Sequence, residues 1–169
     1  MGLISFMKNA GAKLFGKKDA PAEKTEVVSS TPVLSQAELD AQKALLLESE
    51  VRKYGLNIDD LYIQVDDETA IVHGNAHSIA DKEKAILVCG NVEGVAYVED
   101  RLTLPTDERS LEQTESQYYT VEKGDTLSKI AKEFYGNAGK YMVIFEANKP
   151  MLSDPDKIYP GQVLRIPSL

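Results

Sequence analysis

Residues 119–136 read YTVEKGDTLSKIAKEFYG, which is a short strand, a turn and an amphipathic helix in direct succession. The strand is predicted over 118–122, and Lys123-Gly124 are typical turn residues. Asp125 is a good helix N-cap. The apolar residues of the helix recur at i, i+3, i+4 and i+7, namely at Leu127, Ile130, Ala131 and Phe134. Gly136 is then predicted to end the helix.

The chain continues with the rest of a small unit. A second helix is predicted over 138–147, and Tyr159-Pro160-Gly161 turns the chain into a last strand over 162–166. The order β-α-α-β over 118–169 takes roughly 50 residues, which is near the lower limit for a domain that folds alone.

Upstream, residues 35–104 predict a second small domain. Ser35-Gln36-Ala37-Glu38 is a capping box, so a helix begins after Ser35 and runs to about Lys53. The following elements are two strands over 61–66 and 69–74, a helix over 79–89 with Gly90 just past its end, and a third strand over 95–104. The order α-β-β-α-β predicts a small sandwich with the helices on one face of the sheet. The fold class of the chain is therefore α/β, of the α+β kind.

Residues 1–16 predict a short amphipathic helix, because apolar residues recur at helical spacing with lysines on the other faces. Such a helix either attaches to a membrane surface or docks on the protein's own domain, and its small apolar area favours docking. Residues 17–34 and 105–117 lack periodicity and predict two linkers. The first apolar run stops at Lys8, so we expect no signal peptide and a cytoplasmic protein. No stretch approaches the roughly 20 apolar residues of a membrane-spanning helix.

The amino-acid composition excludes several classes of function. The chain has 169 residues, a net charge of -8, one Cys and two His. The surplus of acid argues against nucleic acid as the main partner. A single Cys excludes an intramolecular disulfide framework and a Cys-based zinc finger. The sequence contains no phosphate loop and no nucleophile with an obvious neighbouring base, so we expect no enzyme.

Other polar features have simple structural interpretations. The turn Asp66-Asp67-Glu68 lacks the spacing and the glycine of an EF-hand and is interpreted as a solvated hairpin turn. His73 and His77 are interpreted as structural or exposed. Cys89 is interpreted as a packed small side chain rather than a nucleophile.

The C-terminal unit resembles a LysM domain. Residue types and spacing match along its length, from Tyr119-Thr120-Val121 to Ile158-Tyr159-Pro160-Gly161. LysM domains bind N-acetylglucosamine polymers such as peptidoglycan, in a groove between the turn before the first helix and the loop before the last strand. The resemblance places that groove at Gly124, Asp125, Thr126, Leu127, Met151, Ile158 and Tyr159. The alternative is that these residues only form turns and core.

Residues 40–104 resemble a BON domain, through Val72-His73-Gly74 on a strand and Gly90-Asn91-Val92-Glu93-Gly94-Val95 before the last strand. The two domains in this order, behind the amino-terminal segment, resemble the BON–LysM family of small bacterial potassium-binding proteins. The resemblance implies a cytoplasmic protein that binds K+ as its cofactor and senses it.

K+ is held by several neutral carbonyl oxygens, as in potassium filters. Given the resemblance, we expect its ligands at two helix ends opened by glycine. They are the carbonyls of Met7, Ala10 and Ala12, and those of Gly90, Val92 and Gly94. Each helix end also offers the negative terminus of its dipole to a cation. Without the resemblance, both places would be ordinary helix stops.

The expected function is a monomeric potassium sensor in which K+ changes the arrangement of the two domains. The alternative is a cell-envelope protein that binds peptidoglycan through its LysM domain. A third class is a scaffold whose partner is an unidentified protein.

Overall fold

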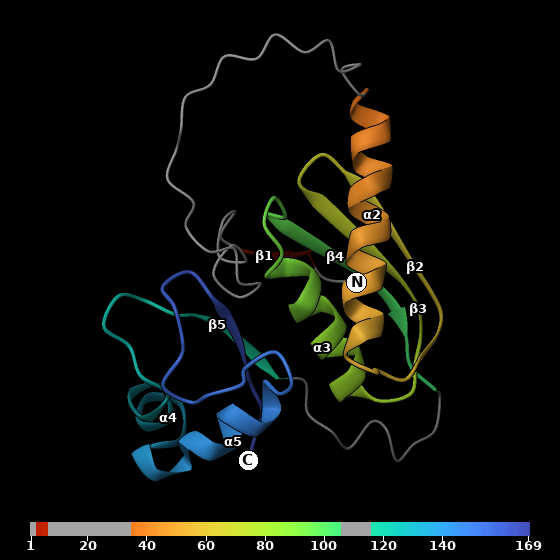
Figure 1. Cartoon of the computed structure of the whole chain (residues 1–169). Helices are drawn as coiled ribbons and strands as arrows, with labels where there is room; N and C mark the ends of the chain where they lie inside the picture. The colour runs from red at the N-terminus through yellow and green to blue at the C-terminus, as the bar shows by residue number, and fades with distance from the viewer. Residues whose placement is uncertain (1–2, 7–34, 106–115) are drawn as a thin grey trace, which may run out of the picture.

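A computed structural model describes residues 3–6, 35–105 and 116–169 of the chain (Figure 1). We call residues 3–6 and 35–105 the larger unit, and residues 116–169 the smaller unit. The elements in chain order are β1 (Leu3–Ser5), α2 (Gln36–Lys53), β2 (Ile58–Asp66), β3 (Thr69–Ala76), α3 (Ile79–Gly90), β4 (Tyr97–Thr103), β5 (Gln117–Thr120), α4 (Leu127–Tyr135), the 3-10 helix η2 (Ala138–Lys140), α5 (Tyr141–Ala147) and β6 (Val163–Ile166). The predicted α+β class is confirmed. The predicted domain boundaries stay predictions, since the linkers fall mostly outside the described residues.

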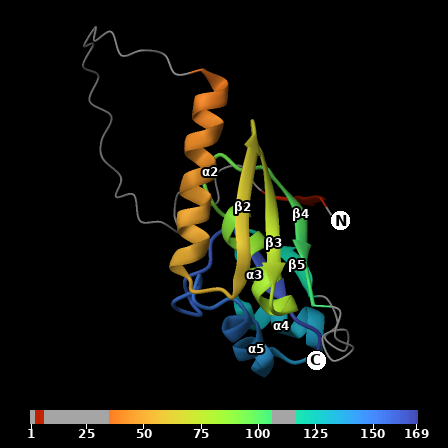
Figure 2. The ribbon, with the colours of Figure 1, turned by 90° about the vertical axis from the view of Figure 1, so that its right-hand side faces the viewer.

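The larger unit is built on a four-stranded sheet in the order β1-β4-β3-β2. β2 and β3 form an antiparallel hairpin, β4 runs parallel to β3, and β1 pairs antiparallel with β4 at the edge. Helix α2 packs along β2, whereas α3 packs across β3 and β4. Figures 1 and 2 show both helices on the same side of the sheet. Strand residues that face the helices, such as Ile63 and Val72, are at most 1% exposed.

The ends of α2 follow local sequence signals. The Ser35 hydroxyl accepts a hydrogen bond from the Glu38 N–H, and the Glu38 carboxylate accepts one from the Ser35 N–H at 2.8 Å. The predicted capping box is therefore confirmed. Beyond the C-terminal end, Gly55 has φ of 62°, a left-handed conformation that costs glycine little.

The predicted amino-terminal helix is wrong over the residues that the structure describes there. Leu3–Ser5 is strand β1, whose residues pair with Tyr97, Val98 and Glu99 of β4. The edge of β4 offers unpaired backbone N–H and C=O groups, and pairing with them outweighs the helical spacing of the apolar side chains. Residues 7–16, the remainder of that prediction, lie outside the described residues.

In the smaller unit, β5 and β6 form an antiparallel pair beside α4 and α5. Thr126, not the predicted Asp125, is the N-cap of α4, because the Thr126 side chain accepts from the Lys129 N–H. Gly136 ends α4 with φ of 68°, as predicted. The predicted second helix over 138–147 is split into η2 and α5.

The buried apolar residues form two clusters, one in each unit, and the clusters meet near β6. Val163 of β6 belongs to the cluster of the larger unit, and Tyr118 and Met151 pack against that same cluster. The smaller unit keeps its own cluster around Leu127, Ile130 and Leu164. The two units are therefore packed against each other through apolar side chains of the smaller one.

Candidate functional site

Three of the predicted carbonyl ligands lie in one loop. Gly90, Val92 and Gly94 occupy alternate positions at the C-terminal end of α3. We call residues 90–94 the α3 loop. The Val92 carbonyl accepts a hydrogen bond from the Val95 N–H at 3.2 Å, which leaves it one lone pair. The Gly90 and Gly94 carbonyls accept no hydrogen bond from any described residue. Within residues 3–6, 35–105 and 116–169, the loop therefore presents carbonyl oxygens without a hydrogen-bond donor.

The electrostatics of the helix end favour a cation. The C-terminus of a helix carries a partial negative charge from its unpaired carbonyls. Helix α2 places Arg52 and Lys53 in its last turn, whereas the last turn of α3, which is fully described, contains no basic residue. The partial charge at the end of α3 is thus not neutralised by side chains of that turn.

The amino terminus reaches this loop through Phe6. The Phe6 N–H donates to the Ala96 carbonyl at 2.7 Å, and the buried Phe6 ring lies directly on Gly90. A Cβ at Gly90 would stand 2.1 Å from Cε1 of that ring, so only glycine allows this approach. The structure thereby brings the residue before Met7 against the α3 loop. Met7, Ala10 and Ala12 themselves lie outside the described residues.

Gly94 also borders an open groove of about 530 Å³ between α2 and the β2–β3 turn. The groove is lined by Gln36, Leu39, Gln42, Lys43, Leu46, Asp67, Glu68 and Gly94. The Lys43 ammonium donates to the Asp67 carbonyl at 2.9 Å. Charges of both signs therefore lie beside the outer end of the loop.

The predicted glycan residues have several different surroundings. Gly124 lies in the turn before α4 with φ of 93°. The Asp125 carboxylate accepts from the Tyr119 hydroxyl and from the Glu122 N–H, both at 2.8 Å. The hydrogen bond to Asp125 is the main cause that raises the pKa of Tyr119 to about 12. These contacts fix the turn between β5 and α4.

The remaining glycan candidates lie in the cap of α4, in the core and between the units. Thr126 caps α4, Leu127 is only 2% exposed and Ile158 packs on the core of the smaller unit. The half-buried Tyr159 donates its backbone N–H to the Gln162 side chain at 3.0 Å. Met151 packs against the core of the larger unit. Glycan binding by these residues stays a prediction.

The other polar candidates have different surroundings. His77 Nε2 lies 2.7 Å from an Asp59 carboxylate oxygen, and the His73 ring lies 5.9 Å from the Tyr62 ring. Cys89 is fully buried, and burial raises the pKa of its thiol to about 12. Across residues 3–6, 35–105 and 116–169, no three His, Cys, Asp or Glu side chains gather to hold a metal ion. Within the same ranges, no helix has the length and apolar character that a bilayer crossing requires.

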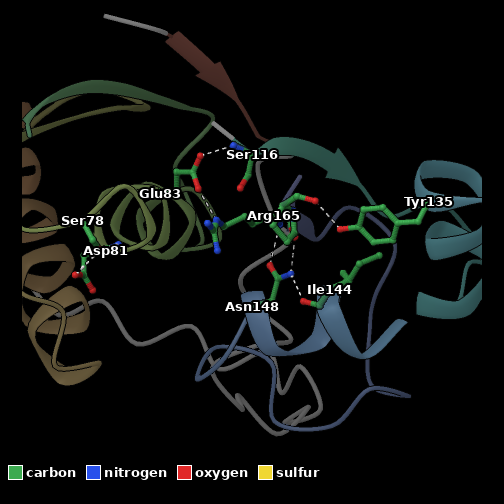
Figure 3. Close-up of polar contacts among 9 residues, drawn as sticks. Ser78, Asp81, Glu83, Ser116, Tyr135, Ile144, Asn148 and Arg165 are labelled. Carbon is green, nitrogen blue, oxygen red and sulfur yellow. Dashed lines mark hydrogen bonds and ion pairs between the residues drawn. The ribbon is translucent and has the colours of Figure 1, made fainter. Parts of the chain in front are cut away.

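Sequence reasoning missed a polar interface between the two units. Figure 3 shows Arg165 of β6 between Glu83 of α3 and Asn148 after α5. The Arg165 guanidinium forms an ion pair with the Glu83 carboxylate, which also accepts from the Ser116 N–H at 2.6 Å. One signal was present in the sequence, because Glu83 falls on the apolar face of the helix with Ile79, Ile86 and Leu87. A charged residue at a core position calls for a buried partner.

The loop residue Asn91 belongs to the same interface. Its side chain is 0% exposed and bonds the backbone of Val163. The predicted end of the helix at 89 was one residue early, since α3 runs through Gly90 and has Asn91 as its C-cap. The partner of Asn91 is 72 positions away, so nothing in the local sequence reveals the contact.

The chain is similar to known proteins in two ways. The family model of the LysM domain matches residues 119–167. The potassium binding protein Kbp of Escherichia coli O6:H1 is 45% identical over 168 residues, which cover 99% of each chain. Shorter matches are an uncharacterized protein of Deinococcus radiodurans, 50% identical over 56 residues (33% of this chain and 21% of that protein), and the uncharacterized protein YqbP of Bacillus subtilis, 41% identical over 58 residues (29% and 26%).

Proposed function

The chain belongs to the family of the potassium binding protein Kbp and carries a LysM domain, and on this premise we propose that it binds K+. The α3 loop supplies carbonyl ligands from Gly90, Val92 and Gly94. The observation that carries the assignment is the loop itself. It follows a helix end without basic residues, and its Gly90 and Gly94 carbonyls accept no hydrogen bond within the described part of the chain. We place the protein among binding proteins rather than enzymes.

The chemistry of the loop suits a monovalent cation. K+ is large and weakly hydrated, and neutral carbonyl dipoles replace its water shell. Ca2+ prefers carboxylates among its oxygen ligands. The proposed ligands are backbone oxygens, and Glu93, the acidic residue of the loop, is exposed. An uncharged site of this kind favours K+ over a divalent ion.

The amino terminus completes the proposed site. Phe6 lies on Gly90, and the next residue along the chain is Met7. We assign the carbonyls of Met7, Ala10 and Ala12 as the ligands from this side. An ion held by both segments favours the state in which they are together, and it shifts the population by its differential affinity for that state. Because the α3 loop also contacts strand β6 of the smaller unit, we propose that this shift changes the arrangement of the two units.

Titration calorimetry of the full chain with KCl, NaCl and LiCl at matched ionic strength tests the function. We expect saturable heat with KCl and much weaker binding of the other two ions. Thermal melts in the same salts give an independent measurement. KCl at a hundred times its dissociation constant is expected to stabilise the fold by about 2.7 kcal/mol. Equal melting in all three salts, with no saturable heat, would exclude the proposed function.

Peptidoglycan binding is a second candidate function, and the LysM match over residues 119–167 favours it. Sedimentation with purified peptidoglycan tests it. Retention of the chain in the pellet, competed by chitin oligosaccharides, would support a working glycan groove. Recovery of all the protein in the supernatant would indicate that the smaller unit has a structural role rather than a glycan-binding one.

We propose a cytoplasmic location, which distinguishes the potassium sensor from the envelope alternative. Cell fractionation with antibody detection tests it directly. The sensor belongs in the soluble cytoplasmic fraction, while recovery in the periplasm or the envelope would favour the peptidoglycan-binding protein.

A further inference from the structure

Strand β2 forms one edge of the four-stranded sheet. The strand order β1-β4-β3-β2 gives it a single strand partner, β3, among the described residues. The outer side of such a strand presents backbone N–H and C=O groups that can pair with another extended segment. Helix α2 runs along β2 (Figure 2). The outer side of β2 therefore lies next to side chains of α2.

Two of these side chains bond the outer side of the strand over part of its length. The Ile63 N–H donates to the Glu48 carboxylate at 2.9 Å, and the Arg52 guanidinium donates to the Leu61 carbonyl at 3.1 Å. The backbone groups of Leu61 and Ile63 therefore point outward, away from β3. Val65 points the same way, because residues two apart in an antiparallel strand direct their backbone groups to the same side.

The outer side of β2 is open at Val65. Within the described part of the chain, no side chain bonds its N–H or C=O as Glu48 and Arg52 bond the earlier positions. An open groove of about 540 Å³ lies here between α2 and the strand, and we call it the β2 groove. Its lining residues are Ala37, Asp40, Ala41, Ala44, Leu45, Glu48, Tyr62, Ile63, Gln64 and Val65. The short alanine side chains of α2 leave room for an extended chain.

The β2 groove combines apolar surface with negative charge. Leu45 and Tyr62 on its walls are 68% and 53% exposed. Asp40 and Glu48 are acidic, and the described lining residues include no Lys, Arg or His. The other groove that borders α2 differs, since Lys43 lines it. A ligand complementary to the β2 groove therefore carries both apolar and basic side chains.

We propose that the β2 groove binds an extended segment of a partner protein in which small apolar and basic residues alternate. The segment adds to the sheet as a further strand, and its backbone pairs with the outward groups of Val65. Main-chain hydrogen bonds supply affinity in this mode of recognition, while alternate side chains supply specificity. The apolar residues contact the alanines and Leu45, and the basic residues lie near Asp40 and Glu48.

Fluorescence anisotropy of labelled peptides, titrated with the full chain, tests the proposal. The probe is Gly-Lys-Val-Lys-Val-Lys-Val-Gly, which we call the lysine probe. A second peptide has glutamate in place of each lysine, and a third has the side chains of the lysine probe on N-methylated amides, which cannot donate hydrogen bonds. We expect saturable binding of the lysine probe and at least about tenfold weaker binding of the other two.

The matched variants Ala41→Lys and Gln42→Lys locate the binding. These neighbours on α2 are both exposed, but Ala41 lines the β2 groove and Gln42 lines the other one. Each substitution adds one positive charge to the chain. We expect Ala41→Lys to weaken binding of the lysine probe at least about tenfold, because it fills the groove and repels the probe. Gln42→Lys should weaken it less than about twofold, since solvent and salt screen its charge.

Hydrogen exchange at the Val65 amide is the second readout, because this N–H points outward into the β2 groove. We expect fast exchange in the free chain and slower exchange when the lysine probe is bound. The Ile63 amide is the internal control, because it already donates to Glu48 and should change little. Attraction of the probe to the acidic surface in general would leave the exchange of Val65 unchanged.

The proposal is overturned if the lysine probe shows no saturable binding up to about 1 mM protein. Equal weakening by Ala41→Lys and Gln42→Lys would also overturn it, and so would binding that does not protect Val65. Slow exchange of Val65 in the free chain would mean that something else covers the groove. Sedimentation velocity would then show whether a second copy is the occupant. None of these outcomes depends on K+, so they leave the proposed function untouched.

Discussion

The space that a side chain at Gly90 would need is filled by the ring of Phe6. Gly90 is the last residue of α3, and glycine within a helix is about 1 kcal/mol less favourable than alanine. This local cost is offset by the close packing of Phe6, which is only 6% exposed. The glycine is thus explained by a contact with a residue 84 positions away in the sequence.

The substitution Gly90→Ala should therefore have opposite effects in two backgrounds. In the wild-type chain the new Cβ displaces the Phe6 ring, and we expect a loss of about 1–3 kcal/mol from overpacking. In a Phe6→Ala chain the space is open, and the same substitution should stabilise by up to about 1 kcal/mol through helix propensity. Urea denaturation of the wild type, the two single variants and the double variant measures the four free energies of unfolding that form this double-mutant cycle.

The affinity of the same four chains for K+ can be measured as well. If the Phe6 ring positions the α3 loop, Gly90→Ala and Phe6→Ala each weaken K+ binding in calorimetry. A gain of stability from Gly90→Ala in the wild-type background would contradict the packing of Phe6 on Gly90.

At the scale of elements, β1 closes an edge that β4 would otherwise expose. It pairs with β4 through Leu3, Ile4 and Ser5, and its short length leaves little edge of its own. Exposed strand edges are templates for pairing with another chain. The amino-terminal strand therefore both protects the sheet and carries Phe6 to the α3 loop.

Removal of residues 1–6 should make the chain self-associate. The uncovered edge of β4 is expected to pair with a second copy, giving dimers at about 100 µM, within the µM–mM range where exposed edges associate. Sedimentation velocity over a concentration series measures this. The control is Leu3→Ser, which changes a side chain that is 64% exposed and keeps the strand backbone. A truncated chain that stays monomeric throughout would contradict the protective role of β1.

The elements differ in how well local sequence predicts them. Ser35 with Glu38 predicted the start of α2, and Gly136 predicted the end of α4, because these caps involve residues at most a few positions apart. Strand β1 was missed because its pairing partner is distant in the chain. Helical spacing of apolar residues carries no information about a free sheet edge elsewhere.

In the candidate site, too, local sequence predicts some features, whereas others depend on residues that are distant in the chain. A glycine predicted a helix end near Gly90, and α3 does end there, whereas K+ binding by the carbonyls of Gly90, Val92 and Gly94 stays a prediction. The contacts of Asn91 with β6 could not be predicted from the sequence. An asparagine after the end of a helix looks the same in the sequence whether its amide faces solvent or contacts a strand.

At the scale of the whole molecule, α3 belongs to the larger unit and also contacts the smaller one. Val163 of β6 is buried in the cluster of the larger unit, and the Glu83–Arg165 ion pair lies beside it. The side chains of the pair are only 6% and 11% exposed. A buried charge without its partner is strongly destabilising, so the pair ties the stability of one unit to the presence of the other.

Arg165→Met should uncouple the two units. It leaves the Glu83 carboxylate buried without a counter-charge, and we expect a loss of about 3–5 kcal/mol for the docked state. Differential scanning calorimetry should then resolve two transitions in place of a single cooperative one. The double variant Glu83→Gln/Arg165→Met removes both charges while the Gln carbonyl can still accept from Ser116, so most of the loss is expected to be recovered.

Lys157→Met is the matched control on the same unit, because it removes a lysine whose pair with Asp154 is solvated, with side chains 66% and 39% exposed. It should change stability by less than about 1 kcal/mol and keep one transition. Two transitions in the wild-type chain would mean that the units unfold independently and that the interface carries little energy. A double variant no more stable than Arg165→Met would instead locate the cost in lost packing of the arginine stem rather than in the unpaired charge of Glu83.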